Sequence, residues 1–284
     1  MRKLLSILCF SILLLSCQRE AQNVLPPQSL PAQTLQNVAY GNDPAQKMDI
    51  YLPAGRTDTT KVLIMVHGGA WIEGDKTDMA QFVPVLQQRL PGYVIVNLNY
   101  RLATVVANHF PAQETDMKAA VDFLIQKSGE YKFSHKFVLL GASAGAHMAL
   151  LQAYKYNTPS IKAVVDFFGP SDMVGLYNST TDPAGLIAFQ ILMQGTPSSN
   201  AALYEQSSPI HFVSAQSPPT IILHGTDDMV VPVELSILLA NKLQSFEVVH
   251  QLELYNGLGH DVWPEESMTD AFDKIEAFIE TNVE

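Results

Sequence analysis

The sequence of 284 residues has few cysteines and few charged residues. It contains two cysteines and 16% charged side chains, and acidic residues outnumber basic ones by 28 to 17. The formal charge of −11 disfavours nucleic acid as a partner, because the phosphates would be repelled. The sequence contains no cysteine cluster, H-E-x-x-H motif, phosphate-binding loop or dinucleotide-binding motif. We therefore expect neither a metal nor a cofactor.

An apolar run at the N-terminus, residues 4–15, follows Arg2 and Lys3. Basic residues before an apolar run too short to span a bilayer comfortably are typical of a secretory signal. The run leads into Leu14-Leu15-Ser16-Cys17, which resembles the bacterial lipobox, whose cysteine is lipidated and becomes the mature N-terminus. We therefore expect residues 1–16 to be a lipoprotein signal peptide. Cys17 would anchor the exported protein to a bacterial membrane, in the periplasm or at the cell surface. An ordinary signal peptide with an incidental cysteine is the alternative.

Residues 17–36 predict a flexible tether. They are rich in glutamine and proline and show no apolar period, so they cannot bury enough surface to fold. The chain as a whole is 47% hydrophobic, which is ordinary for a globular protein. Residues 37–284 have the length of one large α/β domain.

Continuous apolar runs alternate with helical patterns in this domain. Met117, Ala120, Val121 and Leu124 follow the i, i+3, i+4, i+7 spacing of a helix, and the segment 144–154 is apolar nearly all round. The apolar runs predict strands that are covered on both faces, and they comprise residues 62–66, 94–96, 137–140, 163–168 and 221–223. This alternation predicts an α/β fold with a mostly parallel central sheet flanked by helices. Such sheets bind ligands at the carboxyl ends of their strands.

The alternation lapses between residues 170 and 209. An apolar stretch, residues 186–193, lies there between Asp182-Pro183 and Gly195-Thr196-Pro197. We expect a small helical cap over the strand ends, with a long ordered loop as the alternative.

The strongest motif is Gly141-Ala142-Ser143-Ala144-Gly145, between the run 137–140 and the helical segment 144–154. It matches the G-x-S-x-G nucleophile elbow in the strand-to-helix setting that this motif requires. Side chains at the two glycine positions would collide with neighbouring elements. The turn also places the Ser143 hydroxyl at a helix N-terminus, which favours developing negative charge. Ser143 is therefore the expected nucleophile, and a plain glycine-rich turn is the alternative.

A second motif, His67-Gly68-Gly69-Ala70-Trp71, follows the run 62–66. The tetrahedral intermediate of acyl transfer carries an oxyanion that needs N–H donors, and glycine lets a backbone amide approach without a Cβ in the way. We expect the amides of Gly68, Gly69 and Ala144 to form this oxyanion hole, and Trp71 to contact the substrate.

From about Lys47 onward the sequence resembles the α/β-hydrolase superfamily. It is most similar to the esterase branch that includes hormone-sensitive-lipase-like carboxylesterases, acetyl esterases and bacterial feruloyl esterases. Supporting stretches are Met48-Asp49-Ile50-Tyr51, Gly74-Asp75-Lys76 and Asn99-Tyr100-Arg101-Leu102. The resemblance implies the α/β-hydrolase fold with a small cap and a triad in the chain order serine, acid, histidine. Ala70 stands where the family has a third glycine, and Ala142 where the hormone-sensitive-lipase group commonly has aspartate.

The acid of this fold follows a late strand, and the run 221–223 leads into the adjacent Asp227 and Asp228. In relatives the acid lies four residues before a proline, which is Pro232 here, and this implies Asp228. Asp227 is the main alternative and Asp172 a more distant one.

The base must be chosen from eight histidines, and a lone histidine is usually structural. His260 lies in a glycine-containing loop after the strand-like segment 248–255 and completes the chain order of the triad. His67 and His224 end strands and are expected to orient their loops. His147 is held on the helix that follows Ser143.

These residues predict a serine carboxylic-ester hydrolase that works through Ser143, His260, Asp228 and an acyl-enzyme. The short cap predicts short-chain or aromatic acyl groups, and the family resemblance implies removal of acetyl or feruloyl groups from polysaccharides. The expected partner is thus a small-molecule or carbohydrate ester. An amide hydrolase (formamidase or peptidase) on the same fold and a non-catalytic binding module are the alternatives.

Overall fold

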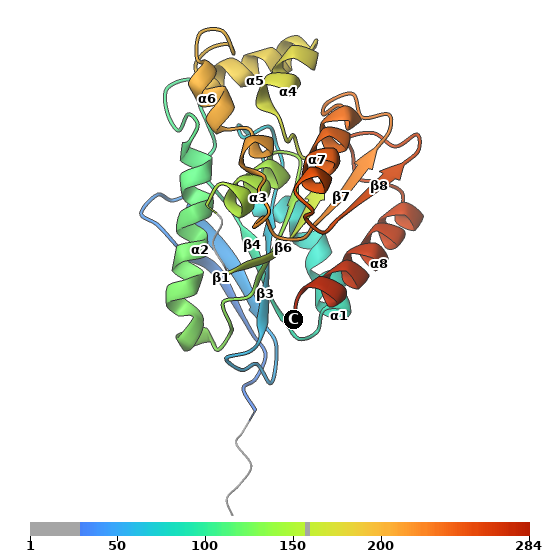
Figure 1. The fold of residues 1–284 in the computed structure, drawn as a ribbon. Coiled ribbons are helices and arrows are strands. Elements are labelled where there is room, and N and C mark those ends of the chain that lie inside the picture. Colours follow the sequence, from blue (N-terminus) through green and yellow to red (C-terminus); the bar gives the residue numbers. More distant parts are fainter. Residues whose placement is uncertain (1–28, 157–159) are drawn as a thin grey trace, which may run out of the picture.

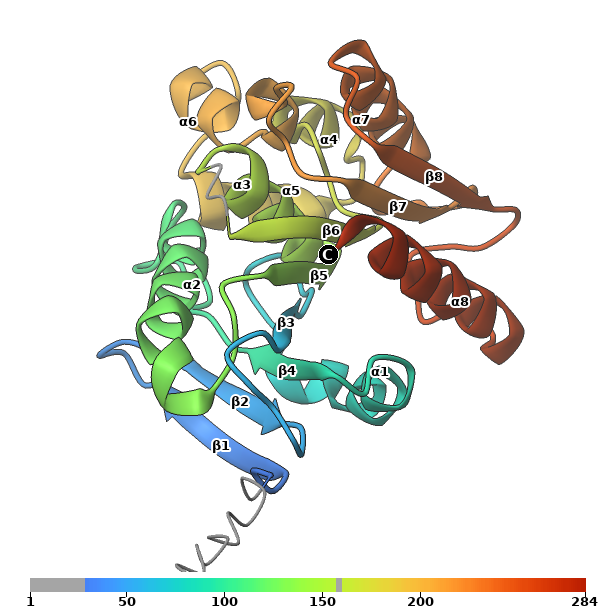
Figure 2. The same ribbon diagram turned by 60° about the horizontal axis from the view of Figure 1, so that its bottom comes forward.

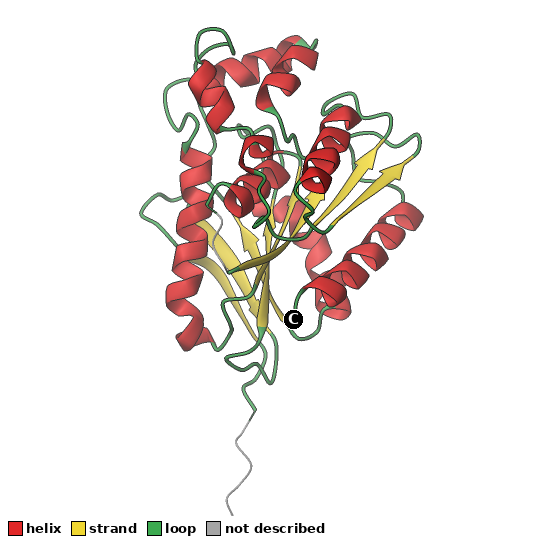
Figure 3. Cartoon of the chain, viewed as in Figure 1, coloured by secondary structure: helices red, strands yellow, loops and turns green. Residues whose placement is uncertain are grey.

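The computed structural model describes residues 29–156 and 160–284, so the expected signal peptide and Cys17 lie outside the described residues. One central sheet of eight strands has helices on both faces (Figures 1 and 3). In chain order the strands are β1 (Gln33–Ala39), β2 (Lys47–Leu52), β3 (Lys61–Val66), β4 (Tyr93–Leu98), β5 (Phe137–Ala142), β6 (Ile161–Phe167), β7 (Thr220–Gly225) and β8 (His250–Tyr255).

The strand order in the sheet is β1-β2-β4-β3-β5-β6-β7-β8. β1 and β2 pair antiparallel with each other, and β2 pairs antiparallel with β4. All other neighbours, from β4 to β8, are parallel. The five apolar runs of the sequence correspond to β3–β7, so the predicted mostly parallel sheet is confirmed.

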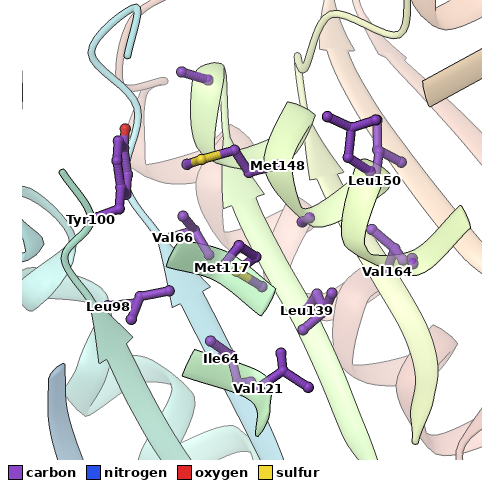
Figure 4. Close-up of a cluster of buried hydrophobic side chains, with 14 of the residues drawn as sticks. Ile64, Val66, Leu98, Tyr100, Met117, Val121, Leu139, Met148, Leu150 and Val164 are labelled. Carbon is purple, nitrogen blue, oxygen red and sulfur yellow. The ribbon is translucent and has the colours of Figure 1, made fainter. Parts of the chain in front are cut away.

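Helices cover both faces of the sheet, which is why its central strands are largely apolar (Figure 2). Side chains of β3 alternate between the two sides: Ile64 and Val66 belong to one buried cluster, and Leu63 and Met65 to the other. Figure 4 shows part of the first cluster, where Met117 and Val121 pack near Ile64. The helices of this first side are α2 (Ala112–Tyr131), α3 (Ala144–Tyr154) and α7 (Val233–Ser245). Those of the second side are η1 (Lys76–Phe82), α1 (Val83–Arg89) and α8 (Glu265–Asn282).

The predicted tether 17–36 is wrong at its C-terminal end, because residues 33–36 belong to β1. This edge strand pairs with β2 through Gln33 opposite Leu52 and Thr34 opposite Tyr51. Most β1 side chains are exposed. The strand is therefore held by backbone hydrogen bonds along the sheet edge, which leave no apolar period in the sequence.

The segment between β6 and β7 is helical and lies over the carboxyl ends of the strands, at the top of Figure 1. α5 begins with Pro183 in its first turn, and the side chain of Asp182 caps it by accepting from the N–H of Gly185. The elements of this cap are α4 (Met173–Ser179), α5 (Pro183–Met193), α6 (Ala201–Gln206) and η2 (Pro209–Phe212).

Among the described residues, no helix combines the length and the apolarity that crossing a membrane requires.

Candidate active site

Ser143 lies at the sharp turn between β5 and α3, with φ 54° and ψ −121°. A non-glycine residue held in such a sparsely populated backbone region stores strain of about 1–3 kcal/mol. The turn is possible because of the two glycines that flank it. An added Cβ would lie 2.3 Å from the carbonyl carbon of Gly145 if placed on Gly141, and 2.1 Å from the oxygen of Val66 if placed on Gly145. The strained backbone holds the serine at the tip of the turn, as a nucleophile elbow requires.

Three side chains far apart in the sequence form one hydrogen-bonded chain at the end of the sheet. The hydroxyl of Ser143 lies 2.8 Å from Nε2 of His260, and Nδ1 of His260 lies 2.7 Å from Oδ2 of Asp228. Because an ionised carboxylate can only accept, Nδ1 carries the proton and Nε2 is free to accept the proton of Ser143. The structure thus brings these three residues into the arrangement of a Ser–His–Asp triad.

Four N–H groups hold the carboxylate of Asp228. Its Oδ1 accepts from the backbone of Val230 and Val231, each at 2.8 Å, and its Oδ2 accepts from His260 and, at 3.1 Å, from Nε2 of His224. Burial alone would raise the pKa of Asp228. The hydrogen bonds from His224 and His260 outweigh burial and hold this pKa well below its ordinary value. Asp228 is therefore ionised at neutral pH.

The two alternative acids have other roles. Asp227 is exposed and accepts a hydrogen bond from the hydroxyl of Thr226. Asp172 caps α4 by accepting from the N–H of Val174 at 2.9 Å. Of the three carboxylates, Asp228 is the one placed at the imidazole of His260.

His224 does more than orient its loop. Its Nδ1 lies 2.7 Å from the hydroxyl of Ser236, and its Nε2 lies 2.9 Å from the carbonyl of Val231 as well as close to Asp228. Since that carbonyl can only accept, Nε2 carries the proton and Nδ1 accepts from Ser236. A second buried imidazole thus holds the same carboxylate oxygen that His260 uses. Proximity to Asp228 in the sequence is the only sign of this role.

The loop after β3 turns sharply beside Ser143. Residues 69–71 have φ values of 106°, 47° and 62° in succession. Tyr100 supports the start of this loop, because its hydroxyl donates to the carbonyl of Gly68 at 3.2 Å and its ring stacks on that of His67 with centroids 4.3 Å apart. The loop is therefore fixed before any substrate arrives, as an oxyanion hole requires.

The backbone amides expected to hold an oxyanion lie close to Ser143 and are unused. An added Cβ on Gly68 would lie 3.2 Å from the Cβ of Ser143, so the backbone at Gly68 lies against this serine. Within residues 29–156 and 160–284, no hydrogen bond engages the N–H of Gly68, Gly69 or Ala144. Over the same residues the N–H of Ala70 is equally free, and Ala70 lines the cavity in front of Ser143. The amide of Ala70 is thus a further candidate donor to the oxyanion. The sequence did not suggest it, because glycine is the residue expected at this position.

Trp71 is fixed by a buried histidine. Its indole N–H donates to Nδ1 of His147 at 3.1 Å, and Nε2 of His147 donates to the carbonyl of Ser207 at 2.7 Å. Burial lowers the pKa of His147 to about 4, so the ring is neutral at pH 7, as these two bonds require. His147 thereby ties the loop after β3 to the end of α6 in the cap.

A cavity of about 240 Å³ lies in front of Ser143, under the cap. Leu176 of α4 and Phe189 of α5 line it and are buried, whereas Thr181 and Asp182 line it and are exposed. The interior is therefore mostly apolar, and the exposed part of the lining combines these polar residues with Met229 and Val230. An acyl or aromatic group fits such an interior, with a more polar group left outside.

Asp166 of β6 is a second buried carboxyl group near this site. Its Oδ1 accepts from the N–H of Gly169 at 2.7 Å, while no hydrogen bond to Oδ2 is found among the described residues. Burial raises the pKa of Asp166 to about 7, against the lowering influence of the Gly169 bond and of His224.

The chain matches known esterases in sequence and in fold. The BD-FAE family model matches residues 48–243, a stretch that includes Ser143 and Asp228. Esterase LipC of Mycobacterium tuberculosis is 29% identical over 241 residues, which cover 78% of this chain and 58% of LipC. The chain thus spans somewhat more than half the length of this relative.

Two solved structures share the fold. A bifunctional GH43-CE protein of Bacteroides eggerthii has a TM-score of 0.74 and 25% identity, covering 86% of this chain and 38% of that one. A truncated form of a carbohydrate esterase from gut microbiota has a TM-score of 0.72 and 25% identity, covering 89% of this chain and 99% of that one. These likenesses confirm the predicted α/β-hydrolase fold.

Proposed function

We propose that this chain, which belongs to the BD-FAE family, is a serine carboxylic-ester hydrolase that forms an acyl-enzyme on Ser143. The observation that carries the proposal is the continuous hydrogen-bonded chain from Ser143 through His260 to Asp228, at 2.8 and 2.7 Å. The free backbone amides beside the nucleophile meet the second requirement of acyl transfer, which is to stabilise an oxyanion. The likeness to LipC, named an esterase, supports the same reaction class.

The first half of the reaction acylates Ser143. Its Oγ attacks the ester carbonyl carbon while its proton passes to Nε2 of His260, and the carbonyl electron pair becomes an oxyanion. The backbone amides near residues 68–70 and at Ala144 hold this oxyanion. Asp228, ionised and fixed, stabilises the imidazolium of His260. The bond to the alcohol oxygen then breaks, and His260 gives its proton to the leaving alcohol.

The second half releases the acid. Water attacks the acyl carbon as His260 takes one of its protons, and the same amides hold the second oxyanion. This intermediate collapses by breaking the bond to Oγ of Ser143, which recovers its proton from His260. The enzyme returns to its starting state.

The acyl group of the substrate is short or aromatic, and the alcohol part is a polysaccharide carrying acetyl or feruloyl groups. A cavity of about 240 Å³, lined by the buried Leu176 and Phe189, supports the small acyl group. The exposed Thr181 and Asp182 at the edge of the cavity suit a hydroxyl-rich alcohol part. We expect a higher kcat/KM on acetyl and feruloyl esters than on an octanoyl ester of the same alcohol. A clear preference for octanoyl would contradict the small-acyl assignment.

The nucleophile is tested by Ser143→Ala. We expect kcat on p-nitrophenyl acetate to fall about a millionfold, because the acyl-enzyme cannot form. Far-ultraviolet circular dichroism should be unchanged. Ser179→Ala, on the cap helix α4, is the matched serine control and should keep parental turnover. A folded Ser143→Ala protein that hydrolyses the ester at the parental rate would disprove the assignment. A parent protein without ester turnover would favour the binding module.

We also propose that the protein is exported and anchored by a lipid on Cys17. The support is the sequence Leu14-Leu15-Ser16-Cys17 behind a basic start and an apolar run. Expression of the full chain in a bacterium should yield a mature N-terminus at a diacylated Cys17, seen by mass spectrometry. Cys17→Ser should abolish this product. An unmodified N-terminus cleaved at another residue in the parent would contradict the anchor.

A further inference from the structure

A second cavity lies behind one wall of the candidate active site. Helices η1, α1 and α8 cover one face of the sheet (Figure 2). The second cavity has a volume of about 180 Å³, and residues of these three helices contribute to its lining. Phe168 connects this second cavity to the candidate active site. Its ring lines this cavity and packs on the imidazole of His260, with centroids 4.6 Å apart. Ser143 lines the other cavity, so the two spaces are distinct.

Aromatic rings and thioethers dominate the lining of this second cavity. Phenyl rings attract another ring edge-to-face, and methionine sulfur makes favourable contacts with ring edges. The residues that supply these groups are Met79, Phe82, Phe167, Phe168, Met268 and Phe272. A flat aromatic ligand matches this lining better than a hydrogen-bonding one.

The volume suits one ring. An engineered apolar cavity of about 150 Å³ in another protein stays dry and binds benzene. The present cavity of about 180 Å³ is of similar size, and its lining is likewise mainly apolar. A single substituted ring is therefore of the right size to fill it.

The acidic residues around the cavity disfavour binding of an aromatic ligand that carries a negative charge. Asp78 and Asp261 are the charged residues that line it, and both are acidic and exposed. Val262 beside them is 68% exposed, so apolar surface leads from the solvent to the interior. A carboxylate on the ligand would be repelled here, and the formal charge of −11 adds to that effect.

We propose that this cavity is a binding site for a neutral molecule with a single aromatic ring, separate from the site of ester cleavage. A ring bound there contacts Phe168 and lies one side chain away from His260. The proposal concerns binding alone, so its outcome is independent of whether Ser143 cleaves esters.

Fluorobenzene is the probe, observed by ¹⁹F NMR during titration with the full protein, and 4-fluorobenzoate is its charged counterpart. We expect saturable binding of fluorobenzene, and binding of 4-fluorobenzoate weaker by at least about tenfold. Asp261→Asn should narrow this difference, because it removes one of the two negative charges.

Two variants show in which cavity the probe binds, because each variant fills one of the two cavities with a larger side chain. Met268→Trp fills the second cavity from a half-buried position on α8, and Ala188→Phe fills the cavity at Ser143. We expect Met268→Trp to weaken fluorobenzene binding by about tenfold or more and Ala188→Phe to leave it unchanged. Leu86→Phe, which fills the second cavity from α1, replaces Met268→Trp if that protein does not fold.

Three results would overturn the proposal. The first is an absence of saturable fluorobenzene binding to the folded parent. The second is binding that Ala188→Phe abolishes and Met268→Trp leaves intact, since the probe would then lie at Ser143. The third is equal affinity for fluorobenzene and 4-fluorobenzoate.

Discussion

Two buried carboxyl groups, one in β6 and one in the loop after the neighbouring strand β7, differ in charge, although both side chains are shielded from solvent. Asp228, after β7, accepts from four N–H groups, and its pKa lies well below the ordinary value. Asp166, in β6, accepts from one N–H group, and burial raises its pKa to about 7. Donors, rather than burial, decide whether a buried acid stays charged. The donors converge on the carboxylate that faces His260.

The largest expected effect on turnover comes from replacing Asp228, and the same replacement at Asp166 provides the direct comparison. Asp228→Asn should lower kcat on p-nitrophenyl acetate by about 10⁴-fold, because an amide no longer fixes the tautomer of His260 or stabilises its cation. Asp166→Asn should lower kcat by less than about tenfold, since Asp166 makes no contact with the triad in the part of the chain described. Steady-state kinetics on both variants, with circular dichroism as the folding control, check the contrast. Similar losses in the two would contradict a special role for Asp228.

A smaller effect is expected from the second imidazole at Asp228. His224→Met removes one donor, and His224→Gln keeps an N–H that reaches the same oxygen. We expect kcat to fall about 10- to 100-fold in His224→Met with KM nearly unchanged, and His224→Gln to recover much of the loss. With one donor fewer, the carboxylate of Asp228 is held less firmly and therefore positions the imidazole of His260 less well. Equal losses of kcat in both variants would indicate that the N–H donated to Asp228 is not what matters, and that His224 has only a structural role.

The smallest effect concerns stability rather than turnover. Asp166 keeps its proton up to about pH 7 in the folded protein, whereas the unfolded chain releases it near pH 4. Between these values the folded state binds more protons. The stability linked to Asp166 is therefore complete below about pH 4 and is lost as pH rises to about 7.

Asp166→Asn removes this dependence. The Tm of the variant relative to the parent should rise between about pH 4.5 and 7.5, as measured by thermal denaturation. His147 acts in the opposite sense in both proteins, since its folded pKa of about 4 lies below its ordinary value, so its contribution cancels in the comparison. A Tm difference that is constant with pH would contradict the raised pKa of Asp166.

The core of the fold was predictable because both faces of the sheet are buried. Continuous apolar runs mark β3–β7, and helical spacing marks α2. β1 was not predictable, since its exposed side chains leave no period and its pairing with β2 relies on backbone hydrogen bonds. Local sequence patterns reveal which side chains are buried. An edge strand buries few side chains, so such patterns do not reveal it.

The candidate site was predictable where a motif ties chemistry to local geometry. The G-x-S-x-G pentapeptide located Ser143, and family spacing favoured Asp228 over Asp227. The second role of His224 and the buried charge state of Asp166 were not predictable. Asp166 lies within the apolar run 163–168, and nothing in that run indicates that its carboxyl group accepts a hydrogen bond from a single N–H group, that of Gly169. Such features depend on which backbone groups the fold brings together.

The most direct measurement is the site of covalent labelling. The full protein is treated with a fluorophosphonate, and the modified peptide is identified by mass spectrometry. One adduct on Ser143 is expected, formed slowly in Asp228→Asn and not at all in Ser143→Ala. An adduct on another residue, or no adduct in a protein that still hydrolyses esters, would contradict Ser143 as the nucleophile.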